Sequence, residues 1–544
     1  MQSLSGQGTS RLAAEHLKSS RANVLSVPQF RRQAQAVRQL AIKAIAAPAQ
    51  TDVKHALRNV KPQLLINGKF VDASSGKTFP TENPATKEEL IQVAEGSAED
   101  VEAAIDAARD AFDKGPWPRM TGRQRGEILF KLADLIEENI DEIAMLETLD
   151  NGKPFKYART SDVPQAIEHL RYYAGFADKI HGKTIPCNGK MMAYTYREPL
   201  GVIGQIIPWN FPVLMMAWKI APALAMGNTI VMKVAEQTPL SALRVGELAL
   251  EAGLPAGCLN LVLGDGPVAG AALSKSKRIQ KLAFTGSTEV GKIIMKQAAE
   301  NIVPVTLELG GKSPNIICPD ANIDEAVEGA HFALFFNMGQ CCTAGSRTFV
   351  HADIYDEFVG KARERAMATN VGDPFGEGTE LGPQVSKEQL DIILGYIEQG
   401  KKDGAKLECG GKIKDGTNGY FLEPTVFSNV TDEMVIARDE IFGPVQCILK
   451  WNTIEEVIER SNSNEYGLAA GVWTKNLNWM NSLSRGVQSG TIWVNCYDVF
   501  DAAVPFGGYK LSGIGREHGD EVLGHYTQVK SVYVPLEEPI GWNA

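Results

Sequence analysis

The middle of the chain alternates between short runs of apolar residues and longer segments in which apolar residues recur every three or four positions. The runs GVIGQII, NTIVMKV, CLNLVLG and KLAFTG have the length of buried strands, and helical stretches such as 239–253 and 288–300 follow them. A second series starts at Pro314, with predicted helices at 323–336 and 354–369. Strands that alternate with helices are typical of a parallel sheet covered by helices. We therefore predict an α/β fold with two parallel-sheet domains that face each other.

The first part of the chain predicts a hairpin and several amphipathic helices. The segment LLINGKFVDAS alternates about an Asn-Gly pair, which favours a tight hairpin turn, so we expect regular structure to begin near Gln63. The tetrapeptide SAED, from Ser97 to Asp100, resembles a capping box that opens a helix. Two more amphipathic helices are predicted at about 121–150 and 163–178.

Two segments predict strands that leave the body of the protein. The segment 184–198 turns at Asn188-Gly189 and alternates afterwards, which predicts a projecting β-hairpin, with an ordinary surface hairpin as the alternative. Near the C-terminus, YTQVKSVYVP from Tyr526 to Pro535 reads as an exposed edge strand. An exposed edge suits pairing between subunits.

The first fifty residues differ in charge from the rest of the chain. They hold five Arg and two Lys against the single acid Glu15, a net charge of +6, and since the whole chain carries −10 the remainder carries −16. An Arg-rich, Ser-rich, acid-poor N-terminus is typical of an organellar transit peptide. We therefore expect a leader at 1–52 and import into the mitochondrial matrix, with the chloroplast as second choice. A basic arm that binds anions and a solvated extension are the alternatives.

The acidic body argues against nucleic acid as the main partner. The chain has no apolar run of eighteen residues, so no transmembrane helix and no membrane partner are expected. Eight cysteines occur without a CxxC pair, which suggests neither a metal site nor a disulfide framework. Cys341 and Cys342 lie together between Gly339 and Gly345. A thiol in such a loop is a nucleophile if it becomes a thiolate; a plain buried thiol is the alternative.

Polar groups follow the predicted strands at their carboxyl ends, where open parallel sheets bind ligands. A carboxylate such as Glu236, after NTIVMKV with Lys233, accepts both hydroxyls of an adenosine ribose and repels a 2′-phosphate, which favours NAD over NADP. Gly286 and Ser287 open a helix after KLAFTG, and helix N-termini suit a pyrophosphate. A surface ion pair and a capped turn are the alternatives.

Three further positions carry side chains that assist a thiol. Asn210, in the proline-flanked loop PWNFP, is the neutral amide donor that an oxyanion hole requires, although a lone Asn is more often a turn residue. Glu308 ends the strand VTLEL, where burial raises the pKa of a carboxyl toward that of a general base. Glu440 is a second acid, beside Phe442. No His has triad spacing with a Cys or Ser, which argues against a papain-like enzyme.

The motifs PWNFP, MKVAEQTP, FTGSTEVG, LELGGKSP, GQCCTAGSR and EIFGP occur in one order. With them the sequence resembles the NAD-dependent aldehyde dehydrogenase superfamily, and most closely its mitochondrial class 2 enzymes, over about residues 60–540. The resemblance implies that Cys342 is the nucleophile, Glu308 the general base and Asn210 the oxyanion donor. It implies these cofactor contacts: Trp209, Lys233, Glu236, Gly286, Ser287, Glu440 and Phe442. It implies these walls of the substrate tunnel: Phe211, Met215, Trp218, Phe336, Phe500 and Phe506.

The resemblance also implies two Rossmann-like domains, one binding NAD and one catalytic, with a small β arm for oligomerisation and usually a homotetramer. The expected boundaries are 60–183 with 200–310 for the NAD-binding domain, 311–510 for the catalytic domain, and 184–199 with 520–540 for the arm. The implied reaction oxidises small to medium aliphatic aldehydes, such as acetaldehyde, to acids. Thr343 departs from the third cysteine of many mitochondrial members and leaves the substrate preference open.

Three alternatives remain at this point. A cysteine esterase would use the same thiol, carboxyl and amide with an incidental cofactor. A non-catalytic, crystallin-like protein would tolerate loss of these side chains, but all of them are present. A CoA-acylating semialdehyde dehydrogenase would not need a base that activates water, and Glu308 argues against it.

Overall fold

The computed structural model of the 544-residue chain describes residues 48–538. The predicted leader lies outside the described residues, apart from 48–52. Regular structure begins earlier than predicted, with α3 (Gln50–Asn59) ahead of the predicted start at Gln63. Ala56 and Val60 of this segment are buried and the helix packs on α6 (Ile140–Asn151). The segment contains few apolar residues, so its sequence resembles a polar linker, and its contacts with the rest of the protein stabilise the helix.

The first sheet has eight strands in the order β19-β11-β10-β7-β8-β9-β1-β2. Its five central strands are parallel, and the outer three are antiparallel to their neighbours. Along the chain they are β1 (Leu64–Ile66), β2 (Lys69–Val71), β7 (Val202–Ile206), β8 (Thr229–Lys233), β9 (Leu259–Val262), β10 (Lys281–Thr285), β11 (Val305–Glu308) and β19 (Gly513–Ile514). The predicted hairpin is confirmed, and its turn residues Asn67 and Gly68 both have positive φ, as a tight two-residue turn requires.

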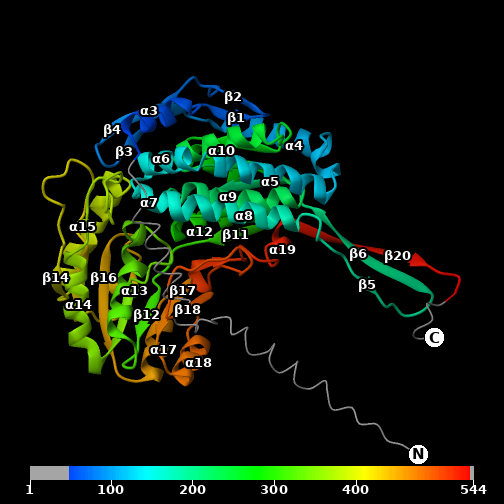
Figure 1. Ribbon diagram of the computed structural model, residues 1–544. Coiled ribbons are helices and arrows are strands. Elements are labelled where there is room, and N and C mark those ends of the chain that lie inside the picture. Colours follow the sequence, from blue (N-terminus) through cyan, green and yellow to red (C-terminus); the bar gives the residue numbers. More distant parts are fainter. Residues whose placement is uncertain (1–47, 539–544) are drawn as a thin grey trace, which may run out of the picture. The chain divides into compact units, whose positions relative to one another are not determined.

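Helices cover both faces of this sheet (Figure 1). They include α4 (Ala98–Asp113), α5 (Gly122–Glu138), α8 (Val163–Phe176), α9 (Pro212–Ala225), α10 (Leu240–Glu251), α11 (Ala271–Lys275) and α12 (Thr288–Ala299). The predicted capping box is present, with Ser97 and Asp100 bonded reciprocally at the start of α4. The predicted helix at 121–150 is wrong in one respect, because it is two helices, α5 and α6. Asn139 separates the two helices. Its backbone is not helical, and its side chain donates a hydrogen bond to the Leu135 carbonyl.

The second sheet has seven strands in the order β14-β15-β16-β13-β12-β17-β18, and only β14 is antiparallel. Its strands are β12 (Pro314–Ile317), β13 (Arg347–His351), β14 (Lys406–Cys409), β15 (Thr425–Ser428), β16 (Val445–Trp451), β17 (Ala469–Trp473) and β18 (Thr491–Val494). Its helices are α13 (Ile323–Phe335), α14 (Tyr355–Met367), α15 (Lys387–Lys402), α16 (Val435–Arg438), α17 (Ile454–Asn462) and α18 (Leu477–Gly486). The predicted α/β fold with two parallel sheets is confirmed.

Short elements complete the described chain. They are β3 (Thr78–Asn83) and β4 (Glu88–Ala94), which form a hairpin, α7 (Phe155–Tyr157), α19 (Leu523–Tyr526), and the single turns η1 (Trp117–Arg119), η2 (Ala158–Asp162), η3 (Gly266–Gly270), η4 (Phe336–Gly339), η5 (Ala352–Ile354) and η6 (Lys510–Ser512). No helix between residues 48 and 538 has the length and apolar character needed to cross a membrane.

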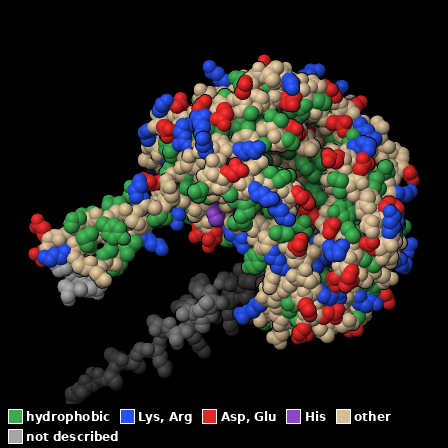
Figure 2. All heavy atoms as spheres, turned by 180° about the vertical axis from the view of Figure 1, so that it is seen from behind, with side chains coloured by type: hydrophobic (Ala, Val, Ile, Leu, Met, Phe, Trp, Pro, Cys, Tyr) green, Lys and Arg blue, Asp and Glu red, His purple; other side chains and the backbone are tan. Residues whose placement is uncertain are grey.

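A three-stranded arm projects from the two-sheet body (Figure 1). The hairpin strands β5 (Thr184–Ile185) and β6 (Met191–Pro199) carry β20 (Thr527–Pro535) as an antiparallel edge strand. Both segments were predicted as strands from their alternation. Apolar side chains gather on this arm in Figure 2. The exposed ones are Ile185, Tyr194, Tyr196, Val529 and Tyr533.

Candidate active site

The segment that carries Cys341 and Cys342, called the cysteine segment below, follows a turn with unusual backbone angles. After α13, Asn337 and Met338 have φ of 50° and 58°, the left-handed region that costs an L-residue energy. A Cβ on Gly339, where φ is also positive, would lie 2.2 Å from the carbonyl carbon of Gly443. The segment therefore turns sharply against the loop before β16, and Cys342 follows this turn half-buried. Strain of this kind is concentrated at functional sites.

The loop that carries Asn210 lies directly against the cysteine segment. The Asn210 side chain donates to the Gln340 carbonyl at 3.1 Å, and the Asn337 side chain donates back to the Asn210 carbonyl at 2.9 Å. An amide nitrogen carries two hydrogens, so the second N–H of Asn210 is not needed for this bond. The two loops are tied together although 130 residues separate Asn210 from Gln340.

Glu308 ends β11 in the centre of the molecule. The next residues form the short link to β12, and here a Cβ on Gly311 would lie only 2.5 Å from the Cys342 carbonyl oxygen. The Glu308 side chain is buried, and neither of its oxygens has a hydrogen-bond partner among the described residues. Burial, with the nearby charge of Glu517, raises the pKa of Glu308 well above its ordinary value. The link between the two sheets thus brings the strand end to the cysteine segment.

The three residues predicted to carry the chemistry therefore come from three separate segments that meet. In this arrangement the surroundings of the Cys342 thiol oppose the loss of its proton. Its hydrogen bond with Cys341, then burial, raises its pKa well above the ordinary value for a thiol. A nucleophilic role thus requires a group that accepts the proton.

Lys233 and Glu236, predicted to bind the ribose, form an ion pair of 2.9 Å at the carboxyl end of β8. Lys233 is buried, whereas Glu236 is one-third exposed. A Cβ on Gly266 would have only one heavy atom within 4 Å, Glu236 Oε1 at 3.8 Å, so the backbone leaves space beside this carboxylate. The Oε1 atom of Gln237 is buried without a partner among the described residues. These features suit a polyhydroxyl ligand at the strand end.

Ser287 caps α12 and accepts from the Val290 N–H at 3.3 Å. The preceding Gly286 donates its N–H to the Glu308 carbonyl at 3.1 Å, so the predicted phosphate loop and the base share one backbone contact. Thr285 Oγ1 is buried without a partner among residues 48–538. A helix N-terminus with an unpaired hydroxyl suits a pyrophosphate. The residues present therefore fit a dinucleotide along β8 and β10.

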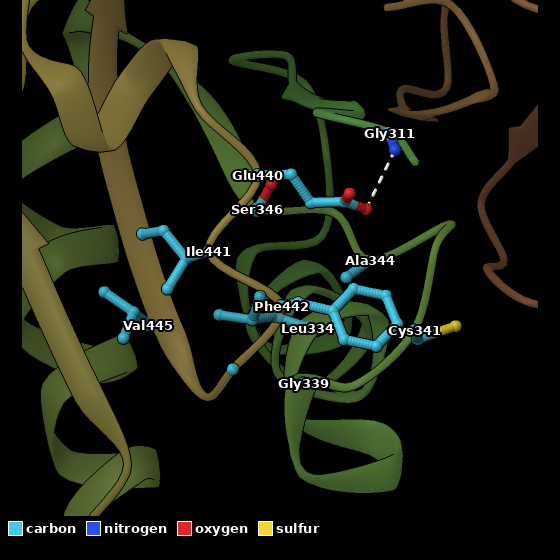
Figure 3. Close-up of a pocket in the computed structure, with 11 residues that line it drawn as sticks. Gly311, Leu334, Gly339, Cys341, Ala344, Ser346, Glu440, Ile441, Phe442 and Val445 are labelled. Carbon is cyan, nitrogen blue, oxygen red and sulfur yellow. Dashed lines mark hydrogen bonds between the residues drawn. The ribbon is translucent and has the colours of Figure 1, made fainter. Parts of the chain in front are cut away.

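Glu440 and Phe442 lie on the loop before β16 and line one pocket with Cys341 and Gly311 (Figure 3). Glu440 Oε1 accepts from the Gly311 N–H at 2.9 Å, and burial raises the pKa of Glu440 to about 7. Phe442 has a φ of 54°, an uncommon angle for a large side chain. Its ring meets Trp209 edge-on, with centroids 5.3 Å apart. The structure thus brings the predicted nicotinamide contacts to the cysteine segment.

The predicted tunnel residues form two aromatic groups. Phe211, Met215 and Trp218 follow one another at helical spacing along the start of α9. The Phe211 ring stacks on Phe336 at 6.0 Å. The second group is Trp218, Phe500 and Phe506, whose ring centroids lie 5.4–5.9 Å apart. Five of the six predicted walls are therefore aromatic residues that contact one another in two groups, and the start of α9 connects the groups through Phe211 and Trp218.

The sequence reasoning missed the buried network that holds the Asn210 loop. Lys153 is buried, pairs with Asp162, donates to the Asn210 carbonyl at 3.1 Å and lies over the Phe211 ring. Asn151 donates to the Trp209 carbonyl at 2.8 Å. The only signal in the sequence was a polar run, DNGK, after an amphipathic helix.

A second missed pair is Lys219 with Glu517, an ion pair buried beside Glu308. Here the sequence did carry a signal. Lys219 is the only charged residue in the otherwise apolar α9, PVLMMAWKIAPALA, and a lone charge in such a helix requires a buried partner.

Two parallel sheets with a thiol, a carboxyl and dinucleotide-compatible strand ends between them define an α/β oxidoreductase. The chain belongs to the aldehyde dehydrogenase family, whose model matches residues 70–532. It is 58% identical over 495 residues to aldehyde dehydrogenase family 2 member B4, mitochondrial, of Arabidopsis thaliana, covering 91% of this chain and 92% of the relative. It is 57% identical over 497 residues to benzaldehyde dehydrogenase, mitochondrial, of Antirrhinum majus, covering 91% and 93%.

Among solved structures, the NAD+ complex of the Bacillus cereus aldehyde dehydrogenase superimposes with a TM-score of 0.89 at 51% identity. The match covers 91% of this chain and all of that one. The family and the class of enzyme that the six motifs predicted are therefore confirmed.

Proposed function

We propose that this protein oxidises aldehydes to carboxylic acids with NAD, through a covalent intermediate on Cys342. The observation that carries this function is the meeting of Cys342, the Asn210 loop and the end of the Glu308 strand at one point. A thiol alone forms an adduct with a carbonyl. Oxidation to a free acid also requires stabilisation of an oxyanion and activation of water.

In the first half of the reaction, the Cys342 sulfur adds to the aldehyde carbon and the carbonyl oxygen becomes an oxyanion. The second N–H of the Asn210 side chain and the Cys342 backbone N–H stabilise this oxyanion. Removing one such donor costs about 2.7–4 kcal/mol in the barrier. The network around Lys153 keeps the Asn210 loop at the thiol, because its ammonium binds the Asn210 carbonyl.

The cofactor is NAD, which when bound supplies the acceptor for the hydride that leaves the thiohemiacetal. Glu236 and Lys233 bind the adenosine ribose, and Ser287 with Gly286 binds the pyrophosphate at the α12 N-terminus. Glu440, Phe442 and Trp209 bind the nicotinamide half beside the cysteine segment. The charge of Glu236 excludes a 2′-phosphate and favours NAD over NADP.

In the second half, Glu308 accepts a proton from the water that hydrolyses the thioester. Burial, with the nearby charge of Glu517, raises the pKa of Glu308, and a carboxylate with a raised pKa is a stronger base toward water. Lys219 and Glu517 lie next to Glu308 and set the charge that it experiences.

The substrate is an apolar aldehyde of small to medium size, with acetaldehyde as the reference compound. The six tunnel walls carry no charged group, so they favour aliphatic or aromatic chains over charged ones. The Antirrhinum majus relative is named for benzaldehyde, so this compound is included in the comparison.

We further propose that the enzyme is a homotetramer in the mitochondrial matrix. The exposed edge and apolar side chains of the arm favour assembly through β20. The basic leader and the mitochondrial names of both relatives favour import.

The test measures NADH and acid production from a panel of aldehydes, with NADP as the control cofactor. Cys342→Ala is expected to form neither product. Glu308→Gln is expected to give one turnover of NADH and then stall at the thioester. Wild-type NADH production by Cys342→Ala would refute the proposal. Acid formation that does not need NAD would favour the esterase alternative.

A further inference from the structure

The side chain of Asn337 links the two segments that supply the oxyanion donors. Its Nδ2 atom donates to the Asn210 carbonyl at 2.9 Å and to the Gln340 carbonyl at 3.0 Å. The Asn210 side chain donates to the same Gln340 carbonyl at 3.1 Å. These three hydrogen bonds close a ring, which we call the Asn337 ring. One side of the ring is the Asn210 loop, and the other is the peptide that leads into Cys341 and Cys342.

The chemistry of the Asn337 ring fixes which atom of each amide lies inside it. An amide nitrogen carries two hydrogens and a carbonyl oxygen carries none, so an atom that faces two carbonyl oxygens is the nitrogen. Asn337 therefore uses both of its hydrogens in the ring, one on each segment. Asn210 uses one, and because an amide is planar, the direction of its second N–H is fixed as well. That second N–H is the one that the proposed reaction assigns to the oxyanion.

Asn337 is kept at a cost to the stability of the fold. Its φ is 50° and its ψ is 38°, in the left-handed region that asparagine tolerates better than most residues. Its side chain is buried, and its Oδ1 atom has no hydrogen-bond partner among the described residues. A buried acceptor without a partner destabilises the folded protein. Backbone strain and an unpaired atom at one residue indicate a functional constraint.

The Asn210 loop also has anchors outside the Asn337 ring. The buried ammonium of Lys153 donates to the Asn210 carbonyl at 3.1 Å, and Asn151 donates to the neighbouring Trp209 carbonyl at 2.8 Å. Removing the Asn337 side chain therefore leaves the loop attached to the network around Lys153. The ring then keeps only one of its two bonds between the segments, the bond from the Asn210 side chain.

We propose that Asn337 is a positioning residue of the oxyanion hole. It sets the distance and the angle between the two donors, the Asn210 side chain and the Cys342 backbone N–H. Such donors act only when they are preorganised at the position that the charged oxygen takes. The inference rests on the proposed function of Cys342 and Asn210. Asn337 itself donates nothing to the oxyanion, because both of its hydrogens are used in the ring.

The test compares two reagents that react with the same thiol without NAD. Iodoacetamide alkylates Cys342 by displacement at a saturated carbon and forms no oxyanion. p-Nitrophenyl acetate acylates Cys342 by addition to a carbonyl group, which forms one. Both reagents need the thiolate, so the ratio of the two rates cancels a change in the pKa of Cys342. Peptide mass spectrometry measures alkylation, and release of p-nitrophenolate measures acylation, with Cys342→Ala as the blank.

Asn337→Gly removes the amide and keeps the backbone, because glycine adopts a positive φ without strain. Acylation of this variant is expected to be at least about tenfold slower than that of the wild type, but faster than that of Asn210→Ala, since loss of a whole donor costs roughly 10²–10³-fold. Alkylation is expected to be unchanged. Asn337→Asp keeps the size of the side chain and, when ionised, offers no hydrogen, so it should lower the ratio as well.

The matched control for the backbone is Asn429→Gly. Asn429 has a φ of 53° and lies exposed directly after β15, so the substitution and the backbone angle are the same as at Asn337. Neither the acylation rate nor the alkylation rate of this variant should change.

A double variant separates positioning from a structural role. If Asn337 acts through Asn210, Asn337→Gly has no further effect on acylation once Asn210 is replaced by alanine. Additive losses in the double variant, or a ratio in Asn337→Gly equal to that of the wild type, would overturn the positioning role. NADH production from acetaldehyde by the wild type tests the proposed function separately. An active wild type with an unchanged ratio in Asn337→Gly therefore rejects only the positioning role.

Discussion

At the scale of single residues, the buried carboxyl of Glu308 lowers the stability of the folded protein when it is ionised. Its carboxyl is buried without a partner among residues 48–538, and its pKa in the folded protein is raised well above the ordinary 4.5. At pH values between 4.5 and the pKa in the folded protein, the Glu308 carboxyl is protonated in the folded protein and ionised in the unfolded one. Stability therefore falls as pH rises through this window. Ionising Glu308 therefore costs free energy of folding, and its proposed role as the general base requires this cost.

We therefore expect Glu308→Gln to raise the midpoint of thermal unfolding above neutral pH and to leave it unchanged below a pH of about 4.5, where both side chains are neutral. The measurement is differential scanning calorimetry at a series of pH values. Glu300→Gln, at the exposed end of α12, is the matched control and should have no such pH-dependent gain. A stabilisation of Glu308→Gln that is the same at every pH would contradict this account.

Single residues with local signals could be predicted from the sequence, and residues defined by distant partners could not. Glycines beside Cys342 and an acid at the end of an apolar strand marked Glu308 and Cys342 as candidates. Lys153 carries no such mark, because its role comes from a contact across 57 residues of chain.

Among the structural elements, the link from β11 to β12 does the most to position the site. It joins the two sheets within a few residues, and Gly310 and Gly311 let it pass against Glu440 and Cys342. A Cβ on Gly310 would lie 2.0 Å from Glu440 Oε2, and one on Gly311 would lie 2.5 Å from the Cys342 carbonyl oxygen. Neither residue has a positive φ, so backbone conformation does not require glycine at these positions. Glycine is required because there is no space for a side chain.

We expect Gly311→Ala to displace the cysteine segment and to lower kcat/KM by roughly 10²-fold, the effect of misplacing a reacting group by about 1 Å. Steady-state NADH production gives this value. Gly360→Ala is the matched control: it lies exposed in α14 with no heavy atom within 4 Å of an added Cβ. This control should keep full activity and gain up to about 1 kcal/mol in stability. Equal activity in both variants would show that the close approach is unimportant.

Most elements could be predicted because their periodicity reflects burial in the sheets. The break at Asn139 and the helix α3 could not, since a capping side chain and a few tertiary contacts decide them. The two-residue strand β19 was also missed. It pairs with β11 across some 200 residues, and so short a segment has no period of its own.

At the scale of the whole molecule, two parallel sheets turn their loops toward a common site, and this follows from topology. Ligands bind at the carboxyl ends of parallel strands, and β8, β10 and β11 present Lys233, Thr285 and Glu308 at those ends. The alternation of strands and helices predicted this edge. The alternation did not predict that β12 would start beside this edge of the first sheet. That position depends on how the second sheet packs.

The arm extends this argument to assembly. Because β20 is the edge of a three-stranded sheet, its outer N–H and C=O groups face away from β6, and Val529 and Tyr533 are 55% and 65% exposed on it. An edge with apolar side chains favours pairing with another subunit. We expect the double variant Val529→Glu, Tyr533→Glu to sediment as a smaller assembly than the wild-type protein, because like charges on β20 oppose its burial.

Analytical ultracentrifugation measures this change directly, and the body provides a control. Leu477→Glu introduces one such charge at a side chain that is 72% exposed on α18, away from the arm. If β20 is the assembly strand, only the arm variant dissociates, while Leu477→Glu sediments as the wild type. Equal sedimentation of the arm variant and the wild type would assign the exposed β20 edge to some purpose other than assembly.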